Sequence, residues 1–152
     1  MRLVDQEQRT ILLVEDNPDD ERLAVRALAQ CPVPVNLDVV RDGQEAVDYF
    51  FGPNGVVNRE GARYPMLILL DLKLPKLTGF EVLERLRAHP ATKRLPVVIL
   101  TLSDEEQDVR KAYELGANSY VRKPVNFDRF QELVTQLVQY WFTVHSHPRL
   151  PA

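Results

Sequence analysis

The sequence predicts an α/β domain in which helices cover both faces of a parallel sheet. Five short segments of strand length recur along the chain, and each is followed by a segment whose apolar residues have helical spacing. The run from Met66 to Leu70 is apolar throughout, which is typical of a strand buried on both faces. Alternating strands and helices form right-handed βαβ units, so we predict a small doubly wound domain.

The predicted strands are short and favour the extended backbone. They are Thr10–Val14, Asn36–Val40, Met66–Leu70, Val97–Leu100 and Ser119–Arg122. The helices between them are marked by apolar residues three or four positions apart. In the first four helices these residues are Leu23, Ala24, Ala27 and Leu28; Ala46, Val47, Phe50 and Phe51; Val82, Leu83 and Leu86; and Val109, Ala112 and Tyr113. The last helix is predicted from about Phe127 to Trp141. We expect Asn17 to cap the first helix and Pro18 to take its first position.

Length and composition favour one globular domain. The 152 residues have 45% hydrophobic and 27% charged content, and we expect a single domain over residues 1–144, a tail over 145–152 and no fused output domain. The net charge is −3, and positive and negative residues are interspersed along the chain, which argues against direct nucleic-acid or membrane binding. A single cysteine, no leader pattern and no run long enough to span a bilayer favour a cytoplasmic protein.

The connection over residues 52–64 is longer than a usual link between a helix and a strand. We expect a solvated excursion, and the alternative is a loop that docks a partner.

Polar side chains stand at the ends of four predicted strands. Glu15 and Asp16 follow the first, Asp71 the third, Thr101 the fourth and Lys123 the fifth. In the strand order 2-1-3-4-5 the first and third strands are neighbours, so the three carboxylates are expected to converge on one crevice. Each residue alone also has an ordinary explanation, such as an acid favoured by a helix N-terminus.

Crowded carboxylates need a cation. Two unit charges 4 Å apart repel by about 4 kcal/mol at an effective dielectric constant of 20. Oxygen ligands favour Mg²⁺, whereas zinc prefers Cys and His, which are absent from these motifs. A lysine and a hydroxyl beside the acids indicate an anionic ligand with further oxygens, and a phosphoryl group on Asp71 meets that requirement.

The motifs appear in a fixed order. They are Glu15-Asp16-Asn17-Pro18, Asp71-Leu72-Lys73-Leu74-Pro75 with Thr78-Gly79, then Thr101, Tyr120 and Lys123-Pro124. Together they resemble the receiver domain of two-component response regulators over about residues 10–140. The resemblance implies a flavodoxin-like fold with five parallel strands in the order 2-1-3-4-5.

The resemblance also implies a role for each matching residue. Asp71 would accept a phosphoryl group from the phosphohistidine of a sensor histidine kinase, and Thr101 and Lys123 would hold its oxygens. Asp16, Asp71 and the backbone carbonyl of Lys73 would bind Mg²⁺, with Glu15 acting through water. Tyr120 would move inward as the aromatic switch, and the bond before Pro124 would be cis. The protein would catalyse only its own phosphorylation and dephosphorylation.

The predicted last helix is apolar beyond what one sheet face requires. This excess predicts that Tyr140, Trp141 and Phe142 contact a partner. We expect a homodimer through the fourth helix, fifth strand and fifth helix. The long connection, the stand-alone length and the Trp-containing end also resemble response regulators of bacterial phytochromes, so the kinase is expected to be a bacteriophytochrome.

Two other functions are compatible with an aspartate at a strand end. A haloacid-dehalogenase-like phosphohydrolase needs a second acid two residues later, and that position is Lys73. A receiver-like module that takes no phosphate is the other alternative, although all the expected groups are present.

Overall fold

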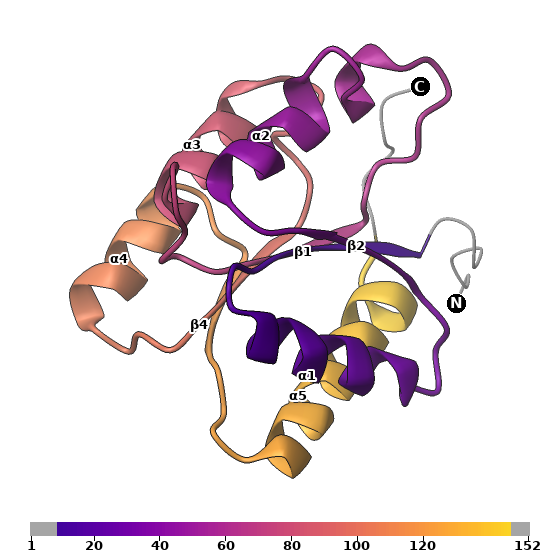
Figure 1. Ribbon diagram of the computed structural model, residues 1–152, viewed down its shortest axis with the longest axis vertical. Coiled ribbons are helices and arrows are strands. Elements are labelled where there is room, and N and C mark those ends of the chain that lie inside the picture. The colour runs from indigo at the N-terminus through magenta and orange to yellow at the C-terminus, as the bar shows by residue number, and fades with distance from the viewer. Residues whose placement is uncertain (1–8, 147–152) are drawn as a thin grey trace.

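The computed structural model describes residues 9–146. Five strands form one parallel sheet in the order β2-β1-β3-β4-β5, which confirms the predicted fold class and strand order. Figure 1 shows the sheet between α2 and α3 on one side and α1 and α5 on the other. The strands are β1 Thr10–Val14, β2 Asn36–Val40, β3 Leu67–Leu70, β4 Val97–Thr101 and β5 Ser119–Arg122. Met66 lies just before β3, and Thr101 is the last residue of β4.

A helix follows each strand. The helices are α1 Pro18–Ala29, α2 Gly43–Phe51, α3 Gly79–Ala88, α4 Glu106–Glu114 and α5 Phe127–Gln139. Asn17 caps α1 by accepting hydrogen bonds from two backbone amides, and Pro18 takes the first position, as the sequence predicts. Thr78 and Glu81 form a reciprocal capping box at the start of α3. No helix within residues 9–146 has both the length and the apolar composition that crossing a bilayer requires.

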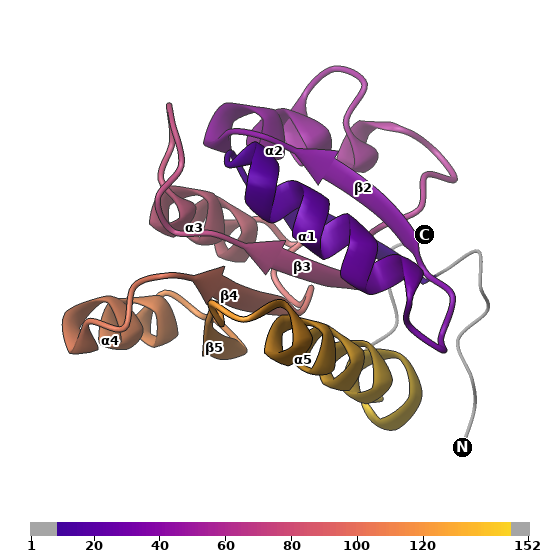
Figure 2. The same ribbon diagram turned by 60° about the horizontal axis from the view of Figure 1, so that its bottom comes forward.

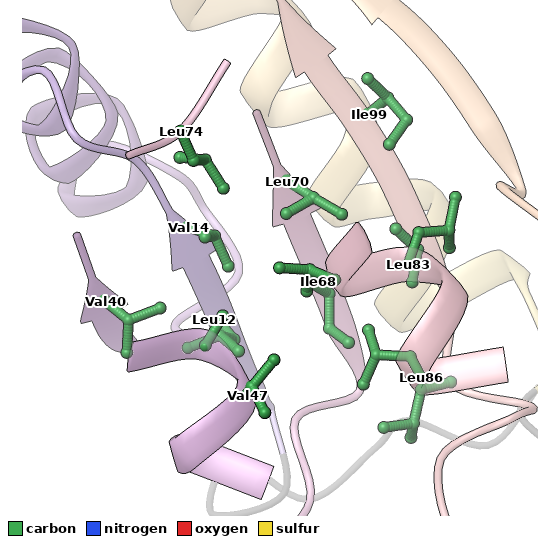
Figure 3. Close-up of a cluster of buried hydrophobic side chains, with 14 of the residues drawn as sticks. Leu12, Val14, Val40, Val47, Ile68, Leu70, Leu74, Leu83, Leu86 and Ile99 are labelled. Atoms are coloured by element: carbon green, nitrogen blue, oxygen red, sulfur yellow. The ribbon is translucent and has the colours of Figure 1, made fainter. Parts of the chain in front are cut away.

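Helices cover both faces of the sheet, and the central strands divide their side chains between two cores. In β1, Leu12 and Val14 face the core formed with α2 and α3, while Ile11 and Leu13 face the core formed with α1 and α5. Figure 2 shows α1 and α5 side by side, and Figure 3 shows the core beneath α2 and α3. Every residue of β1, β3 and β4 is therefore buried, which explains their apolar sequences.

The end of the last helix differs from the prediction. α5 ends at Gln139 and continues as a single π-helical turn, η3 Tyr140–Val144, in which the His145 amide donates to the Tyr140 carbonyl at 2.7 Å. Trp141 and Phe142 are only 7% and 1% exposed and belong to the core under α1 and α5. The prediction of a partner-binding aromatic patch is wrong for these two residues, because the chain's own core takes them. Tyr140 is 48% exposed.

The connection over residues 52–64 is not a fully solvated excursion. It contains a short 3₁₀ helix, η2 Val56–Asn58, and Val56 is buried against α2. The Asn58 side chain donates hydrogen bonds to the carbonyls of Phe51 and Gly52, which ties the segment to the end of α2. Docking of a partner by this segment stays a prediction. Most of the predicted tail, residues 147–152, lies outside the described residues, so the boundary at residue 144 stays a prediction too.

Candidate functional site

Three acids meet at the carboxyl edge of the sheet. Val14 pairs with Leu70 in adjacent strands, so the residues that follow, Glu15 and Asp71, emerge side by side. One carboxylate oxygen from each of Glu15, Asp16 and Asp71 lies within 4.8 Å of the other two. Glu15 and Asp71 are buried and Asp16 is exposed. The predicted convergence of these three side chains is confirmed.

A single ammonium group neutralises much of this acidic cluster. Lys123 follows β5, its side chain is only 5% exposed, and its Nζ donates hydrogen bonds to Glu15, to Asp71 at 2.8 Å and to Asp20 at 3.0 Å. Burial by itself lowers the pKa of Lys123, but the hydrogen bonds to Asp71 and Glu15 outweigh burial and raise that pKa above its usual value. Lys123 is therefore a permanent cation.

The pKa of Glu15 is raised even though Lys123 binds its carboxylate. Burial, helped by the nearby charge of Asp71, outweighs the hydrogen bond and the charge of Lys123, and the pKa of Glu15 is raised to about 7. Burial is thus the main reason why the charged form of Glu15 is disfavoured. A further positive charge at the cluster would stabilise that form.

Both carboxylate oxygens of Asp71 are held by groups from other parts of the chain. The buried Thr101 hydroxyl donates to Oδ1 at 2.9 Å, and Lys123 donates to Oδ2 at 2.8 Å. The backbone amide of Lys73 donates to Oδ1 at 3.3 Å. Asp71 therefore has a defined orientation, with a hydroxyl and an ammonium already beside its reactive oxygens.

Gly79 allows the helix after Asp71 to start close to the site. A Cβ at this position would lie 2.2 Å from the backbone oxygen of Asp71, which is far closer than atoms can approach. The Gly79 amide also donates to the Leu72 carbonyl at 2.9 Å. The loop between Asp71 and α3 is thus tied to the start of that helix, which sets the position of the acid.

Tyr120 lies beside the site but does not contact the acids. It is half-buried in β5, and its hydroxyl donates to the Ser103 carbonyl at 2.8 Å, two residues after Thr101. Its backbone amide donates to the Tyr113 hydroxyl at 3.2 Å. Burial raises the pKa of Tyr120, so the phenol is neutral. Tyr120 thus connects β5 to the loop that follows Thr101.

The predicted cis bond between Lys123 and Pro124 is wrong for this structure. Residues 9–146 contain no cis peptide bond. A trans bond is the lower-energy form before proline by roughly 0.5–1 kcal/mol. Since the Lys123 ammonium reaches the acids across a trans bond, no cis geometry is required to direct it into the cluster.

Asp20 is a site residue that the strand-end motifs do not include. It lies in the first turn of α1 and accepts a hydrogen bond from Lys123. The position of Asp20 in the sequence could have indicated this role, because α1 begins at the same sheet edge where Glu15 and Asp16 emerge. The Lys123 ammonium is therefore bound by three carboxylates, those of Glu15, Asp71 and Asp20.

The donor set fits a hard divalent cation. The acidic cluster presents carboxylate oxygens only, and Asp16 leaves it open to solvent on one side. Mg²⁺ and similar ions prefer a few carboxylates together with waters and a carbonyl. Burial and the charge of Asp71 both disfavour the charged form of Glu15, and a cation bound at the cluster would stabilise that form.

Comparison with known proteins identifies the class. The model of the response regulator receiver domain family matches residues 11–135, and the chain belongs to that family. It is 39% identical to the response regulator Rcp1 of Synechocystis sp. over 92% of this chain and 93% of Rcp1. It is 36% identical to the probable methanogenesis regulatory protein FilR2 of Methanothrix harundinacea, over 91% of this chain and 86% of FilR2.

Solved structures agree with this assignment. The phosphorylated cyanobacterial phytochrome response regulator RcpA superposes with a TM-score of 0.83 at 39% identity, covering 93% of this chain and 99% of that one. The Mn²⁺-bound form of Rcp1 gives a TM-score of 0.80 at 38% identity, with coverage of 93% and 99%. The bacteriophytochrome response regulator AtBRR gives 0.69 at 43% identity, with coverage of 93% and 96%.

These findings establish the protein as a phosphoacceptor response regulator. Its acidic cluster is the divalent-metal pocket of the family, and the class of its signalling partner is a histidine kinase.

Proposed function

We propose that Asp71 accepts the phosphoryl group of a kinase phosphohistidine in a Mg²⁺-dependent reaction, and that the resulting change of charge switches the domain. One observation carries this proposal. The two oxygens of Asp71 are hydrogen-bonded by Thr101 and Lys123, which come from two other strands, and all three groups adjoin the acidic cluster. Phosphoryl transfer depends mainly on such positioning and neutralisation.

In the proposed reaction a carboxylate oxygen of Asp71 attacks phosphorus. The bond between phosphorus and the histidine nitrogen breaks, its electron pair returns to the imidazole, and the imidazole takes a proton. Lys123 and Thr101 move their hydrogen bonds from the carboxylate to phosphoryl oxygens. Asp16, Asp71, the Lys73 carbonyl and, through water, Glu15 would hold Mg²⁺, which supplies positive charge to the phosphoryl oxygens.

The proposed switch follows from the Thr101 contact. When the Thr101 hydroxyl turns toward a phosphoryl oxygen, the space beside it becomes available to the Tyr120 ring. Inward movement of that ring would break the hydrogen bond between the Tyr120 hydroxyl and the Ser103 carbonyl. The loop after β4 would then be released, which converts a local change of charge into a change of surface.

Labelling with acetyl phosphate tests the proposed acceptor. Wild-type protein with Mg²⁺ should gain one acid-stable, base-labile phosphoryl group, and Asp71→Asn should gain none. Asp104→Asn is the matched control, because Asp104 is an exposed acid that pairs with Arg122 outside the cluster. Labelling that persists in Asp71→Asn would refute the assignment. Turnover of unrelated phosphoesters would instead favour the phosphohydrolase alternative and contradict our proposal that the protein processes only its own phosphoryl group.

We further propose that the kinase is a bacteriophytochrome. Support comes from the similarity to the phytochrome response regulators RcpA and AtBRR. Phosphotransfer from a bacteriophytochrome kinase should be at least tenfold faster than from an unrelated histidine kinase at equal concentration. Equal rates would contradict the proposal. We also infer a cytoplasmic location, where such kinases expose their phosphohistidine, and fractionation of cells tests it.

The homodimer stays a proposal on the side formed by α4, β5 and α5. Large exposed apolar side chains support it, namely Tyr113 in α4, Leu102 between β4 and α4, and Val125 between β5 and α5. Sedimentation at micromolar concentration should give a species of twice 17.5 kDa. A persistent 17.5 kDa species would refute the dimer.

A further inference from the structure

The loop that follows Asp71, residues 72–78, has no regular secondary structure, so its contacts with other elements decide where it lies. We call this segment the acceptor loop. Its Lys73 amide donates to Asp71 Oδ1 at 3.3 Å, and the proposed function assigns the Lys73 carbonyl to Mg²⁺. Leu72 and Leu74 of the loop are buried in the core beneath α2 and α3. The position of the acceptor loop therefore affects the metal pocket.

The first residue of α2 supports this loop. The Gly43 amide donates to the Pro75 carbonyl at 3.2 Å, and a Cβ at Gly43 would lie 1.9 Å from the Leu77 carbonyl oxygen. Cβ atoms essentially never make contacts below 3.0 Å, so a side chain at this position would force the two segments apart by about 1 Å. Ala46 and Phe50 anchor α2 in the core and are fully buried. The acceptor loop, rather than the helix, is therefore the part that would move.

Lys76 lies between the two residues whose carbonyls meet Gly43. Its φ of 69° is the only positive value at a non-glycine residue within residues 9–146. A side chain in this left-handed region is strained, and such strain persists only where the surroundings hold the backbone in place. The Lys76 ammonium lies 3.4 Å from the carboxylate of Asp42, which caps α2 through the Glu45 amide. The start of α2 therefore holds the loop in a conformation that Lys76 alone disfavours.

We propose that Gly43 and Lys76 are positioning residues for the metal pocket, which keep the acceptor loop, and with it the Lys73 carbonyl, in place for Mg²⁺. Neither positioning residue belongs to the acidic cluster. The inference rests on the proposed function, in which Lys73 is a metal ligand. When the binding conformation is only partly populated, the apparent affinity falls by the same fraction. Loosening the support should therefore weaken Mg²⁺ binding although the three carboxylates of the cluster are unchanged.

Calorimetric titration of the full chain with Mg²⁺ tests the inference, at a temperature where circular dichroism shows each variant to be folded. Gly43→Ala should bind Mg²⁺ at least about tenfold more weakly than wild type, which is the effect typical of groups that position metal ligands.

Gly55→Ala is the matched control. Gly55 lies beyond the other end of α2 and is also buried, and its added Cβ would lie 2.6 Å from the Phe50 carbonyl oxygen. Neither Gly43 nor Gly55 has a positive φ, so both substitutions test the added Cβ. Gly55→Ala should lower stability as well, but it should change the Mg²⁺ affinity by less than about twofold.

Two variants of Lys76 decide the question if Gly43→Ala does not fold. Lys76→Gly and Lys76→Val both remove the same exposed ammonium. Glycine adopts the left-handed backbone without strain, whereas a β-branched side chain is poorly suited to it. Lys76→Val should therefore bind Mg²⁺ about fivefold more weakly than Lys76→Gly.

The outcomes distinguish this inference from the proposed function. Equal Mg²⁺ affinities of Gly43→Ala and wild type, or of Lys76→Val and Lys76→Gly, would overturn the positioning role alone. Equal losses in Gly43→Ala and Gly55→Ala would also overturn it, because the loss would then follow from lower stability. Absence of Mg²⁺ binding by wild type would overturn the proposed function as well.

Discussion

Replacement of Lys123 by methionine tests the electrostatic argument most directly. Methionine keeps an unbranched chain in a 95%-buried environment but removes the one ammonium that contacts three carboxylates, since Lys123 is 5% exposed. Removing one partner of a buried ion pair costs roughly 3–5 kcal/mol, because the remaining charge is left uncompensated. Glu15, whose pKa is already raised to about 7, can take up a proton and relieve part of this cost. We therefore expect Lys123→Met to lower the free energy of unfolding by about 3 kcal/mol.

Mg²⁺ should reverse much of this loss. A ligand at about 100 times its dissociation constant stabilises the native state by about 2.7 kcal/mol. The ion should bind Lys123→Met more tightly than wild type, because the competing ammonium is gone while Glu15, Asp16 and Asp71 remain. Urea unfolding followed by circular dichroism, with and without Mg²⁺, measures both effects, and the difference between the two proteins should shrink when Mg²⁺ is present.

Lys73→Met is the matched control, because Lys73 is exposed and only its backbone amide contacts Asp71. Its free energy of unfolding should change by less than about 0.5 kcal/mol. The reasoning is refuted if Lys123→Met costs less than about 1 kcal/mol, or if Mg²⁺ stabilises wild type and Lys123→Met equally.

Three further predictions follow from single contacts. Gly79→Ala should lower the free energy of unfolding by about 2 kcal/mol or more, because its Cβ would lie 2.2 Å from the Asp71 carbonyl oxygen; an unchanged urea midpoint would contradict this. Arg87→Met should cost about 2–4 kcal/mol in the same assay, because Arg87 donates to three backbone carbonyls and one side-chain amide between α3 and the ends of β4 and β5. Burial and the hydrogen bond to Asp38 raise the pKa of Tyr49, so its contribution to stability is complete below about pH 10, the value in the unfolded chain, and is lost as pH rises toward the folded value. Tyr49→Phe should flatten the fall of stability above that pH, and an unchanged slope would exclude this contribution.

Much of the site could be predicted because strand ends have little freedom in a parallel sheet. Glu15 and Asp71 follow strands that are neighbours, so their proximity is a consequence of strand order and register. Thr101 ends β4 and Lys123 follows β5 on the same edge, and the structure brings their side chains to Asp71. The chemical roles of these residues are proposals that the labelling experiment tests.

Other features depend on contacts between segments far apart in the chain. The apolar sequence of the last helix does not reveal that a π-helical turn places Trp141 and Phe142 in the core. The first turn of α1 contains acids that look alike in sequence, yet Asp20 reaches Lys123 and Asp19 pairs with Arg22. The bond before Pro124, which the resemblance implied to be cis, is trans.

The amino-acid sequence by itself determined the alternation of strands and helices and the set of polar groups at the strand ends, because apolar periodicity is written along the chain. The strand order was implied by the resemblance of the motifs to receiver domains. Only the tertiary structure decided which carboxylates share the Lys123 ammonium and how deeply each is buried. The physical reason is that desolvation and hydrogen-bond distance depend on side chains that approach from separate elements, and these two quantities decide the energy of every charge in the pocket.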